Sequence, residues 1–367
     1  MANLVTSQWA MCPPKYFGVE YVINPWMEGQ VGRAKNDVAQ QQWQALYELI
    51  SARAKVHLIP AIRGLPDMPF TANAGLVLGK IFVPSAFRFP QRQPEEHFFI
   101  QWFREQGYNI VDLHGEGTFE GEGDALFQPG ETLLWAGYGV RTALEAHPRL
   151  CEIFDVEVAS LRLVDQRFYH LDTCFAPLAD GRVVYYPPAF DQPSLELLHA
   201  RVPPHKRLAV SEEDALNFTC NGVVCGEAYI CNQPTDAFRQ QLKSWGYEVI
   251  ATPLTEFMLA GGAAKCLSLC LTQDVPATTT PGPHFSSAIA DCTIELQGHI
   301  LDNGLMNQVL DAITDAGGSF EIPRLKAGLR HDQESLARIH VSAPTAERLQ
   351  VLLQKLLQLG ARVAGEV

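Results

Sequence analysis

Apolar and polar positions follow the same order at two distant places in the chain. Residues 70–87 (FTANAGLVLGKIFVPSAF) contain two short runs rich in Leu, Val, Ile and Phe, which favour strands. Residues 95–106 then place apolar side chains at the i, i+3, i+4 spacing of an amphipathic helix, and a glycine and a β-branched strand follow within 107–113. The same succession recurs in residues 217–254. The pattern therefore predicts a ββαβ unit at both places.

Three further segments repeat this order less regularly. They are residues 168–200, residues 117–164, and an N-terminal copy made of residues 17–27 (FGVEYVINPWM) with residues 41–60. Copies at a spacing of roughly fifty residues predict a closed ring, here a five-bladed α/β propeller, in preference to one doubly wound sheet. In such a ring the inner ends of the copies share one central pocket. Short polar side chains at these inner ends are Asn24, Asn73, Asp124, His170, Asp172, Asn221 and Cys266.

The composition changes after Thr272. A stretch rich in Thr and Pro predicts a linker over residues 275–287. It separates a catalytic propeller domain, residues 1–274, from a small α+β domain, residues 288–367.

The small domain follows a strand, helix, strand, strand, helix pattern, which predicts a ferredoxin-like α+β fold. Thr345 is the expected N-cap and Gly360 the expected C-cap of its last helix. Its polar groups fall on faces and turns, so we expect it to serve interaction or assembly. The last strand of such a fold is missing from the pattern, which leaves open a continuation beyond Val367.

Composition and charge exclude several classes of protein. The formal net charge of −13 argues against a nucleic-acid partner and is compatible with a small cationic substrate. No stretch of roughly 18 apolar residues and no signal-like start occurs, so we expect no membrane partner and a cytoplasmic location. The nine cysteines include no CxxC pair and no zinc spacing. We therefore expect reduced thiols, no metal and no redox cofactor.

The candidate chemistry centres on Cys266, which closely follows the pair Gly261 and Gly262. Glycines let backbone and ligand approach, and the neighbouring Lys265 could favour a thiolate. The segment HLDT places His170 and Asp172 two residues apart, and the turn FEGEGD (residues 119–124) adds carboxylates. Carboxylates accept paired hydrogen bonds from a guanidinium, so this set suits a planar cation.

Six segments occur in this order along the chain: FTAN, RQPE, FEGEGD, GYGVRT, FYHLDTCF and GGAAKC. Together they resemble the guanidine-modifying superfamily, which contains arginine deiminase, dimethylarginine dimethylaminohydrolase and the amidinotransferases. The resemblance extends from about Cys12 to Leu271. Within the superfamily, VINPWM (residues 22–27) and the appended domain look most like the cyanobacterial arginine dihydrolase module that elsewhere precedes an ornithine cyclodeaminase.

The resemblance implies a five-bladed propeller whose central pocket holds L-arginine, and it also implies a role for each matching residue. These roles are Cys266 as nucleophile, His170 as general acid and then base, Asp124 and Asp172 as a clamp on the guanidinium, Arg92 and Arg141 on the α-carboxylate, and Asn24 and Asn73 as lining. Glu122 is a departure, because relatives more often carry a small residue there.

The expected activity is that of an arginine dihydrolase, which hydrolyses L-arginine to L-ornithine, carbon dioxide and two ammonia through a covalent cysteine intermediate. An arginine deiminase that stops at citrulline, an amidinotransferase, and a non-catalytic propeller that binds a partner are the alternatives. The cyclodeaminase half is expected to be absent, since no Gly-rich dinucleotide motif occurs. A homo-oligomer is left open.

Overall fold

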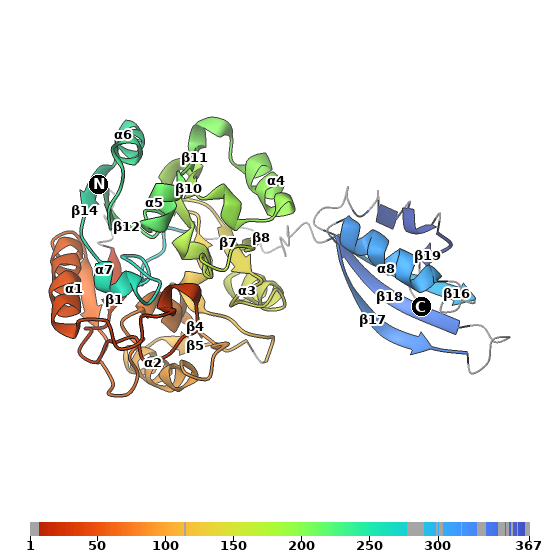
Figure 1. Ribbon diagram of the computed structural model, residues 1–367, viewed down its shortest axis with the longest axis horizontal. Coiled ribbons are helices and arrows are strands. Elements are labelled where there is room, and N and C mark those ends of the chain that lie inside the picture. Colours follow the sequence, from red (N-terminus) through yellow and green to blue (C-terminus); the bar gives the residue numbers. More distant parts are fainter. Residues whose placement is uncertain are drawn as a thin grey trace. The chain divides into compact units, whose positions relative to one another are not determined.

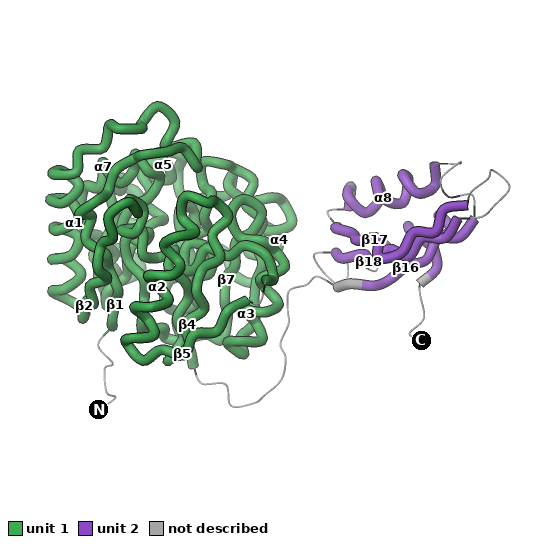
Figure 2. Tube along the Cα trace, turned by 90° about the horizontal axis from the view of Figure 1, so that it is seen from below, with its two compact units in different colours: residues 1–284 green, residues 285–367 purple. Residues whose placement is uncertain are grey.

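The structure is a computed structural model that divides into two compact units, residues 1–284 and residues 285–367 (Figure 2). The boundary between the units falls within the predicted linker, most of which lies outside the described residues. The described residues are 7–113, 115–276, 290–298, 300, 304–316, 318–328, 335–343, 349, 352–353, 355–357 and 359–363.

The first unit contains five three-stranded sheets of one design, which confirms the predicted five-bladed α/β propeller (Figure 1). In four of them two consecutive strands pair in antiparallel fashion, a helix follows, and the third strand pairs in parallel with the second. The strands and helices of these four blades are β3 (Gly75–Leu78), β4 (Ile81–Pro84), α2 (Gln93–Glu105) and β5 (Asn109–Ile110); β6 (Ala125–Phe127), β7 (Leu133–Tyr138), α3 (Ala146–Phe154) and β8 (Glu157–Arg162); β9 (Phe175–Leu178), β10 (Arg182–Tyr185), α4 (Gln192–Arg201) and β11 (Arg207–Ala209); β12 (Val223–Cys225), β13 (Ala228–Cys231), α6 (Asp236–Ser244) and β14 (Glu248–Ala251).

The fifth blade joins the two ends of this unit. Strand β1 (Gln8–Met11) pairs in parallel with β2 (Lys55–Leu58) after helix α1 (Asn36–Ser51), and in antiparallel fashion with β15 (Leu269–Cys270). The sequence pattern placed the start of this blade within residues 17–27, but residues 17–23 form no strand. The strand lies earlier in the chain and is β1. Pro13 and Pro14 follow β1 closely and cannot donate to a ladder, which favours the end of the strand at Met11.

Helix α2 illustrates why the predicted helices form. Pro94 lies in its first turn, where a missing N–H costs nothing. Its apolar face buries Phe99 and Phe103, and the Phe103 ring stacks on that of Phe82 in β4 at a centroid distance of 3.6 Å. Helix and sheet of one blade thus share a core, as the i, i+3, i+4 pattern predicts.

Short turns carry the chain into the first strand of each blade and position the polar inner ends. The 3₁₀ turns η2 (Thr71–Ala74), η3 (Gly121–Gly123) and η4 (Leu171–Thr173) precede β3, β6 and β9. Gly121 in η3 has φ +64°, and a Cβ there would lie 2.7 Å from the Gly75 nitrogen. Neighbouring turns are therefore packed backbone against backbone, which brings their side chains close together.

In its described residues the second unit contains a four-stranded antiparallel sheet, in the ferredoxin-like order β17-β18-β16-β19, and helix α8 (Leu305–Asp315). Its strands are β16 (Ala290–Gly298), β17 (Ser319–Lys326), β18 (Ser335–Ala343) and β19 (Arg362–Val363). The strand that the pattern lacked is therefore present, because two residues of β19 pair with β16. Gly360 has φ 101°, as expected for a glycine cap, whereas Thr345 lies outside the described residues.

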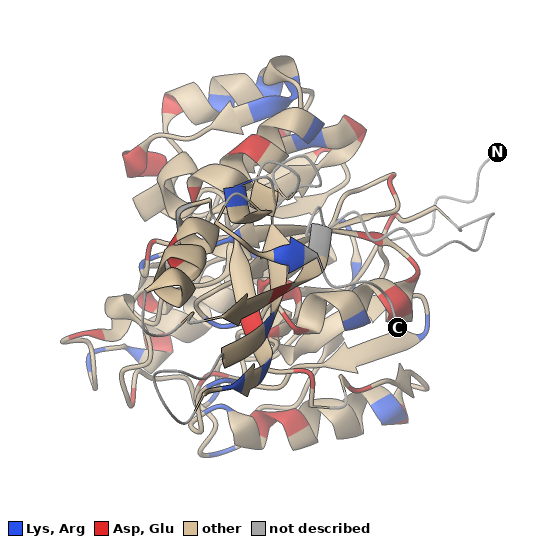
Figure 3. Ribbon diagram, turned by 90° about the vertical axis from the view of Figure 1, so that its right-hand side faces the viewer, with Lys and Arg blue, Asp and Glu red and all other residues tan. Residues whose placement is uncertain are grey.

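Charges of both signs are interspersed along the ribbon, so Lys and Arg do not gather into a long basic segment in the described parts of the chain (Figure 3). Among the described helices, none has the length and apolar character needed to cross a membrane.

Candidate active site

Cys266 lies in the turn that leads into β15 and is 2% exposed. Its Sγ lies 3.2 Å from Asp172 Oδ2 and accepts a hydrogen bond of 3.1 Å from Asn221 Nδ2. Burial, and then the charge of Asp172, raise the pKa of the Cys266 thiol well above its usual range. The thiol is therefore neutral here and donates to Asp172.

Asp172 is fully buried in turn η4. Burial raises the pKa of its carboxyl to about 7, although the nearby Lys265 ammonium opposes the shift. Its Oδ1 has no hydrogen-bond partner among the described residues. Since a buried acceptor without a donor is costly, this oxygen is suited to receive an N–H from a ligand beside Cys266.

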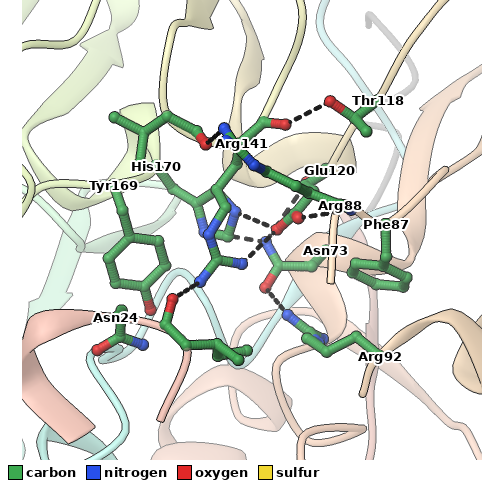
Figure 4. A network of polar contacts seen from close by, with 12 residues as sticks. Asn24, Asn73, Phe87, Arg88, Arg92, Thr118, Glu120, Arg141, Tyr169 and His170 are labelled. Carbon is green, nitrogen blue, oxygen red and sulfur yellow. Dashed lines mark hydrogen bonds and ion pairs between the residues drawn. The ribbon is translucent and has the colours of Figure 1, made fainter. Parts of the chain in front are cut away.

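His170 precedes Asp172 and bonds to a different carboxylate. Its Nε2 lies 2.6 Å from Glu120 Oε2, and its Nδ1 lies 3.5 Å from Asn73 Nδ2 (Figure 4). Glu120 Oε2 also accepts from Arg141 Nη1 at 2.9 Å. Burial would raise the pKa of Glu120, but Arg141 and His170 hold it well below its usual range. Glu120 is therefore an anion placed to stabilise a protonated His170.

Two arginines face the same cavity from different blades. Arg141 lies between the rings of Phe89 and Tyr169, at 4.6 Å from each centroid. Arg92 donates to Glu95 and, at 2.8 Å, to Asn73 Oδ1. The cavity is lined by these arginines together with Asn24, Asn73, Asp67, Tyr169 and Cys266, among others. Because these contacts already fix both guanidinium groups, the two arginines can bind a carboxylate without a further loss of side-chain freedom.

The structure brings most of the predicted site residues together. Asn24, Asn73, Arg92, Arg141 and Cys266 line the cavity directly. Asp172 and His170 lie immediately behind it, each in contact with a lining residue: Asp172 with Cys266, and His170 with Asn73.

Asp124 occupies a different position from the one expected of a guanidinium ligand. Its Oδ2 accepts from the Thr142 hydroxyl at 2.7 Å and its Oδ1 accepts from the Leu171 N–H at 3.0 Å. Burial raises the pKa of Asp124 to about 6. Oδ2 thus joins the end of turn η3 to the loop that carries Thr142, and Oδ1 joins it to turn η4 beside His170. Both oxygens already have a donor within the protein, and the guanidinium contact of Asp124 stays a prediction.

Glu122 and Lys265 form a buried pair at 2.7 Å. Glu122 also accepts from the Cys270 N–H and from Gln273, so it joins η3 to the segment around β15. The Lys265 charge is thereby engaged by Glu122 and acts on Asp172, rather than activating Cys266 directly as the sequence suggested.

Two acidic residues of the site were missed at the level of sequence. Glu120 belongs to FEGEGD, but alternation alone does not tell which carboxylate of that turn meets His170. Asp67 lies in a loop between blades, where no periodic pattern marks it; its Oδ2 accepts from Tyr21 and its Oδ1 has no partner in the described part of the chain. No group of three His, Cys, Asp or Glu side chains that could hold a metal occurs among the described residues.

A ring of five ββαβ blades around a buried cysteine, a histidine and paired carboxylates and arginines defines a guanidine-modifying enzyme fold. The model of the family "N,N dimethylarginine dimethylhydrolase, eukaryotic" matches residues 14–272, and the chain belongs to this family. The N(G),N(G)-dimethylarginine dimethylaminohydrolase of Mycobacterium tuberculosis is 40% identical over 72% of this chain and 85% of its own length.

A further relative covers the small unit as well. The bifunctional arginine dihydrolase/ornithine cyclodeaminase AgrE of a Nostoc species is 47% identical over 96% of this chain and 50% of its own length. The chain spans about half the length of this relative and of ArgZ from a Synechocystis species. Residues 291–367 match a conserved region of LOR/SDH bifunctional enzymes.

Two crystal structures of the N-terminal domain of ArgZ, named as an arginine dihydrolase, resemble the first unit. One is a cysteine-to-serine variant bound to substrate, with TM-score 0.72, 48% identity, and coverage of 73% of this chain and 98% of that chain. The other is an asparagine-to-serine variant covalently bound to a reaction intermediate, with TM-score 0.72, 48% identity, and coverage of 74% of this chain and 100% of that chain.

Proposed function

We propose that this chain is an arginine dihydrolase, which converts L-arginine and two waters into L-ornithine, carbon dioxide and two ammonia. The observation that supports this most directly is the Cys266 thiol bonded to Asp172, whose second oxygen has no described partner, beside a cavity that two arginines line. The identity of 47% to a protein that contains an arginine dihydrolase adds to it.

The substrate would be held at both of its charged ends. Asp172 accepts N–H groups of the guanidinium next to Cys266. Arg92 and Arg141 bind the α-carboxylate, and the unpaired oxygen of Asp67 is placed for the α-ammonium in the same cavity. Each end of arginine thereby meets the opposite charge in a buried site.

The first hydrolysis follows from these positions. A guanidinium beside Cys266 favours its thiolate, because an opposite charge lowers the pKa of a buried acid. The sulfur adds to the guanidinium carbon, protonated His170 gives its proton to the departing ammonia, and an amidino-thioether remains. His170 then takes a proton from water, the hydroxide adds to the carbon, the C–S bond breaks, and citrulline results. The Glu120 carboxylate stabilises His170 whenever it is charged.

The second hydrolysis requires that citrulline stay bound. Its ureido group is neutral, so amide side chains that both donate and accept are better partners than carboxylates. Asn73 and Asn24 supply such groups in the cavity. Attack of Cys266 on the ureido carbon releases the second ammonia, and water then releases a carbamate that divides into carbon dioxide and ornithine.

The test is a product balance with purified protein and L-arginine. We expect about two ammonia and one ornithine per arginine consumed, little free citrulline, and no turnover by Cys266→Ala although that variant still binds arginine. One ammonia with stoichiometric citrulline would make the enzyme a deiminase. Formation of guanidinoacetate when glycine is added would indicate an amidinotransferase.

The family assignment supports a second candidate reaction, the hydrolysis of N-methylated arginine to citrulline and a methylamine. The same thiol would attack the same carbon, with an alkylamine leaving in place of ammonia. Asymmetric dimethylarginine supplied in competition with arginine separates the two, and we expect arginine to be consumed preferentially.

We propose that the second unit serves assembly. A stretch of 71 residues in this chain is 41% identical to an ornithine cyclodeaminase of Methanothermobacter and covers 17% of that protein. We further expect a reducing compartment such as the cytoplasm, because the proposed nucleophile Cys266 works as a free thiol.

A further inference from the structure

Asn221 bonds to the catalytic segment with every polar atom of its side chain. Its Oδ1 accepts from the backbone N–H groups of Ala263 and Cys266, both at 3.1 Å. Its Nδ2 donates to Cys266 Sγ at 3.1 Å and to the Asp172 backbone oxygen at 2.9 Å. The Asn221 backbone oxygen also accepts from the Lys265 N–H. One side chain therefore connects the cysteine turn with the turn that carries Asp172.

The location of Asn221 explains how it can do this. It lies in the turn before β12, the counterpart of the turns before β3, β6 and β9, and it is fully buried. The Tyr229 hydroxyl donates to the Thr219 carbonyl oxygen in the same turn at 2.7 Å. The turn is thus anchored to its own blade, and Asn221 extends from a fixed backbone to its neighbours.

The two polar partners of the sulfur act in opposite directions. The Asp172 carboxylate accepts from the thiol and favours its neutral form, whereas the N–H of Asn221 points at the sulfur and favours the thiolate. The two backbone bonds to Oδ1 hold the cysteine so that both contacts persist. The ease with which Cys266 ionises therefore depends on the amide of Asn221.

Asn232 provides a matched comparison in the same blade. It is equally buried and also donates to a sulfur, Met258 Sδ at 3.0 Å, and to the Asn217 carbonyl oxygen at 3.2 Å. Its Oδ1 accepts from the Leu254 N–H at 2.9 Å. Asn232 has the same chemistry and burial as Asn221, and none of its described partners is a residue of the site.

We propose that Asn221 is a positioning residue that holds Cys266 toward the substrate carbon and lowers the barrier to forming its thiolate. The proposal rests on the proposed function only in taking Cys266 as the nucleophile.

The test compares Asn221→Ala, Asn221→Ser and Asn232→Ala with the unmodified protein. The rate at which iodoacetamide alkylates Cys266 is measured against pH, and peptide mass spectrometry separates this cysteine from the other eight. We expect Asn221→Ala to move the alkylation profile to higher pH and to slow alkylation near neutral pH by about tenfold, because a donor to the sulfur is lost. Asn221→Ser, whose hydroxyl can donate one bond, should fall between, and Asn232→Ala should keep the original profile.

Arginine turnover supplies the second readout. We expect kcat to fall by about thirtyfold or more in Asn221→Ala and KM to change less, because Arg92 and Arg141 keep their contacts and Asp172 loses only the bond to its backbone oxygen. An unchanged alkylation profile in the folded Asn221 variants, or an equal shift in Asn232→Ala, would overturn the proposal. If Asn221→Ala does not fold, Asn221→Ser decides in the same way. Failure of the unmodified protein to hydrolyse arginine would remove the proposed function, and the alkylation comparison would still decide the role of Asn221.

Discussion

Replacing Glu120 with Gln tests the link between substrate recognition and proton transfer. Glu120 is fully buried and shares one oxygen between His170 Nε2 at 2.6 Å and Arg141 Nη1 at 2.9 Å. Glutamine has nearly the same shape but no charge. The substitution therefore leaves two potential cations without their anionic partner.

The size of the effect follows from these two contacts. A hydrogen bond to a charged group contributes about 1.5–3 kcal/mol, and glutamine can still offer one neutral oxygen. We therefore expect about 3 kcal/mol less stabilisation of the transition state in which His170 is charged, which at about 1.4 kcal/mol per tenfold is roughly a hundredfold loss in kcat. The loss of the anionic partner of the buried Arg141 should in addition lower the free energy of unfolding by about 3 kcal/mol or more.

The assay measures kcat and KM for arginine together with the free energy of unfolding in urea. Glu122→Gln is the control, because Glu122 is also buried and paired, but with Lys265 at 2.7 Å. Both variants should lose stability, whereas only Glu120→Gln should lose about a hundredfold in kcat. If Glu120→Gln turns over arginine at a rate within a few fold of the control, the contact with His170 does not serve the reaction and the reasoning is wrong.

Three other substitutions test separate parts of the site. Burial raises the pKa of Asp172 to about 7, above the ordinary value near 3.9, so the folded state binds the extra proton and the free energy of unfolding should fall as pH rises from about 4 to about 7. Asp172→Asn should flatten this slope when urea unfolding is measured at several pH values. An unchanged slope would contradict the assignment. Gly123→Ala places a methyl 2.3 Å from Asn73 Nδ2 and should reduce turnover by about tenfold or more. The control Gly18→Ala, whose methyl meets nothing within 4 Å, should keep its turnover. Equal activities of the two variants would show that the position of the Asn73 amide is not critical. Arg92→Lys keeps the charge but loses the two-pronged geometry of the guanidinium. The preference in kcat/KM for arginine over agmatine, which lacks the α-carboxylate, should therefore drop by about tenfold or more. A retained preference would place carboxylate recognition elsewhere.

The repeated pattern of the sequence was sufficient to predict the ring, because in four blades the helix packs against strands of its own blade: α1 on β2, α2 on β4 and β5, α3 on β8, and α6 on β14. The first blade was the exception. Its strand β1 pairs with β15, and nothing local in residues 17–27 indicates that the partner of β1 lies about 260 residues away along the chain. Pairing between distant segments is a tertiary choice that hydrophobic periodicity does not encode.

Some site residues could likewise be predicted from local sequence, and others could not. Cys266 and the pair His170 and Asp172 could be identified from residue type and spacing, together with the family resemblance. The sequence could not show whether Glu120 or Asp124 meets His170. That choice depends on which carboxylate accepts from the Thr142 hydroxyl and the Leu171 N–H, and both donors come from other segments of the chain. Asp67 became visible only through its buried oxygen, which is a property of the folded cavity.

The closing of the ring also sets an order in time. Cys266 stands just before β15, which has only two residues and pairs with β1, so the nucleophile is fixed only once residues 8–11 and 269–270 have met. During synthesis the other four blades can form while the reactive thiol has not yet emerged. In the finished protein the same two-residue strand is a natural place for local opening, because short elements with few hydrogen bonds open at low cost. Mild denaturant should therefore abolish turnover before it melts the helices, and activity becomes a reporter of ring closure.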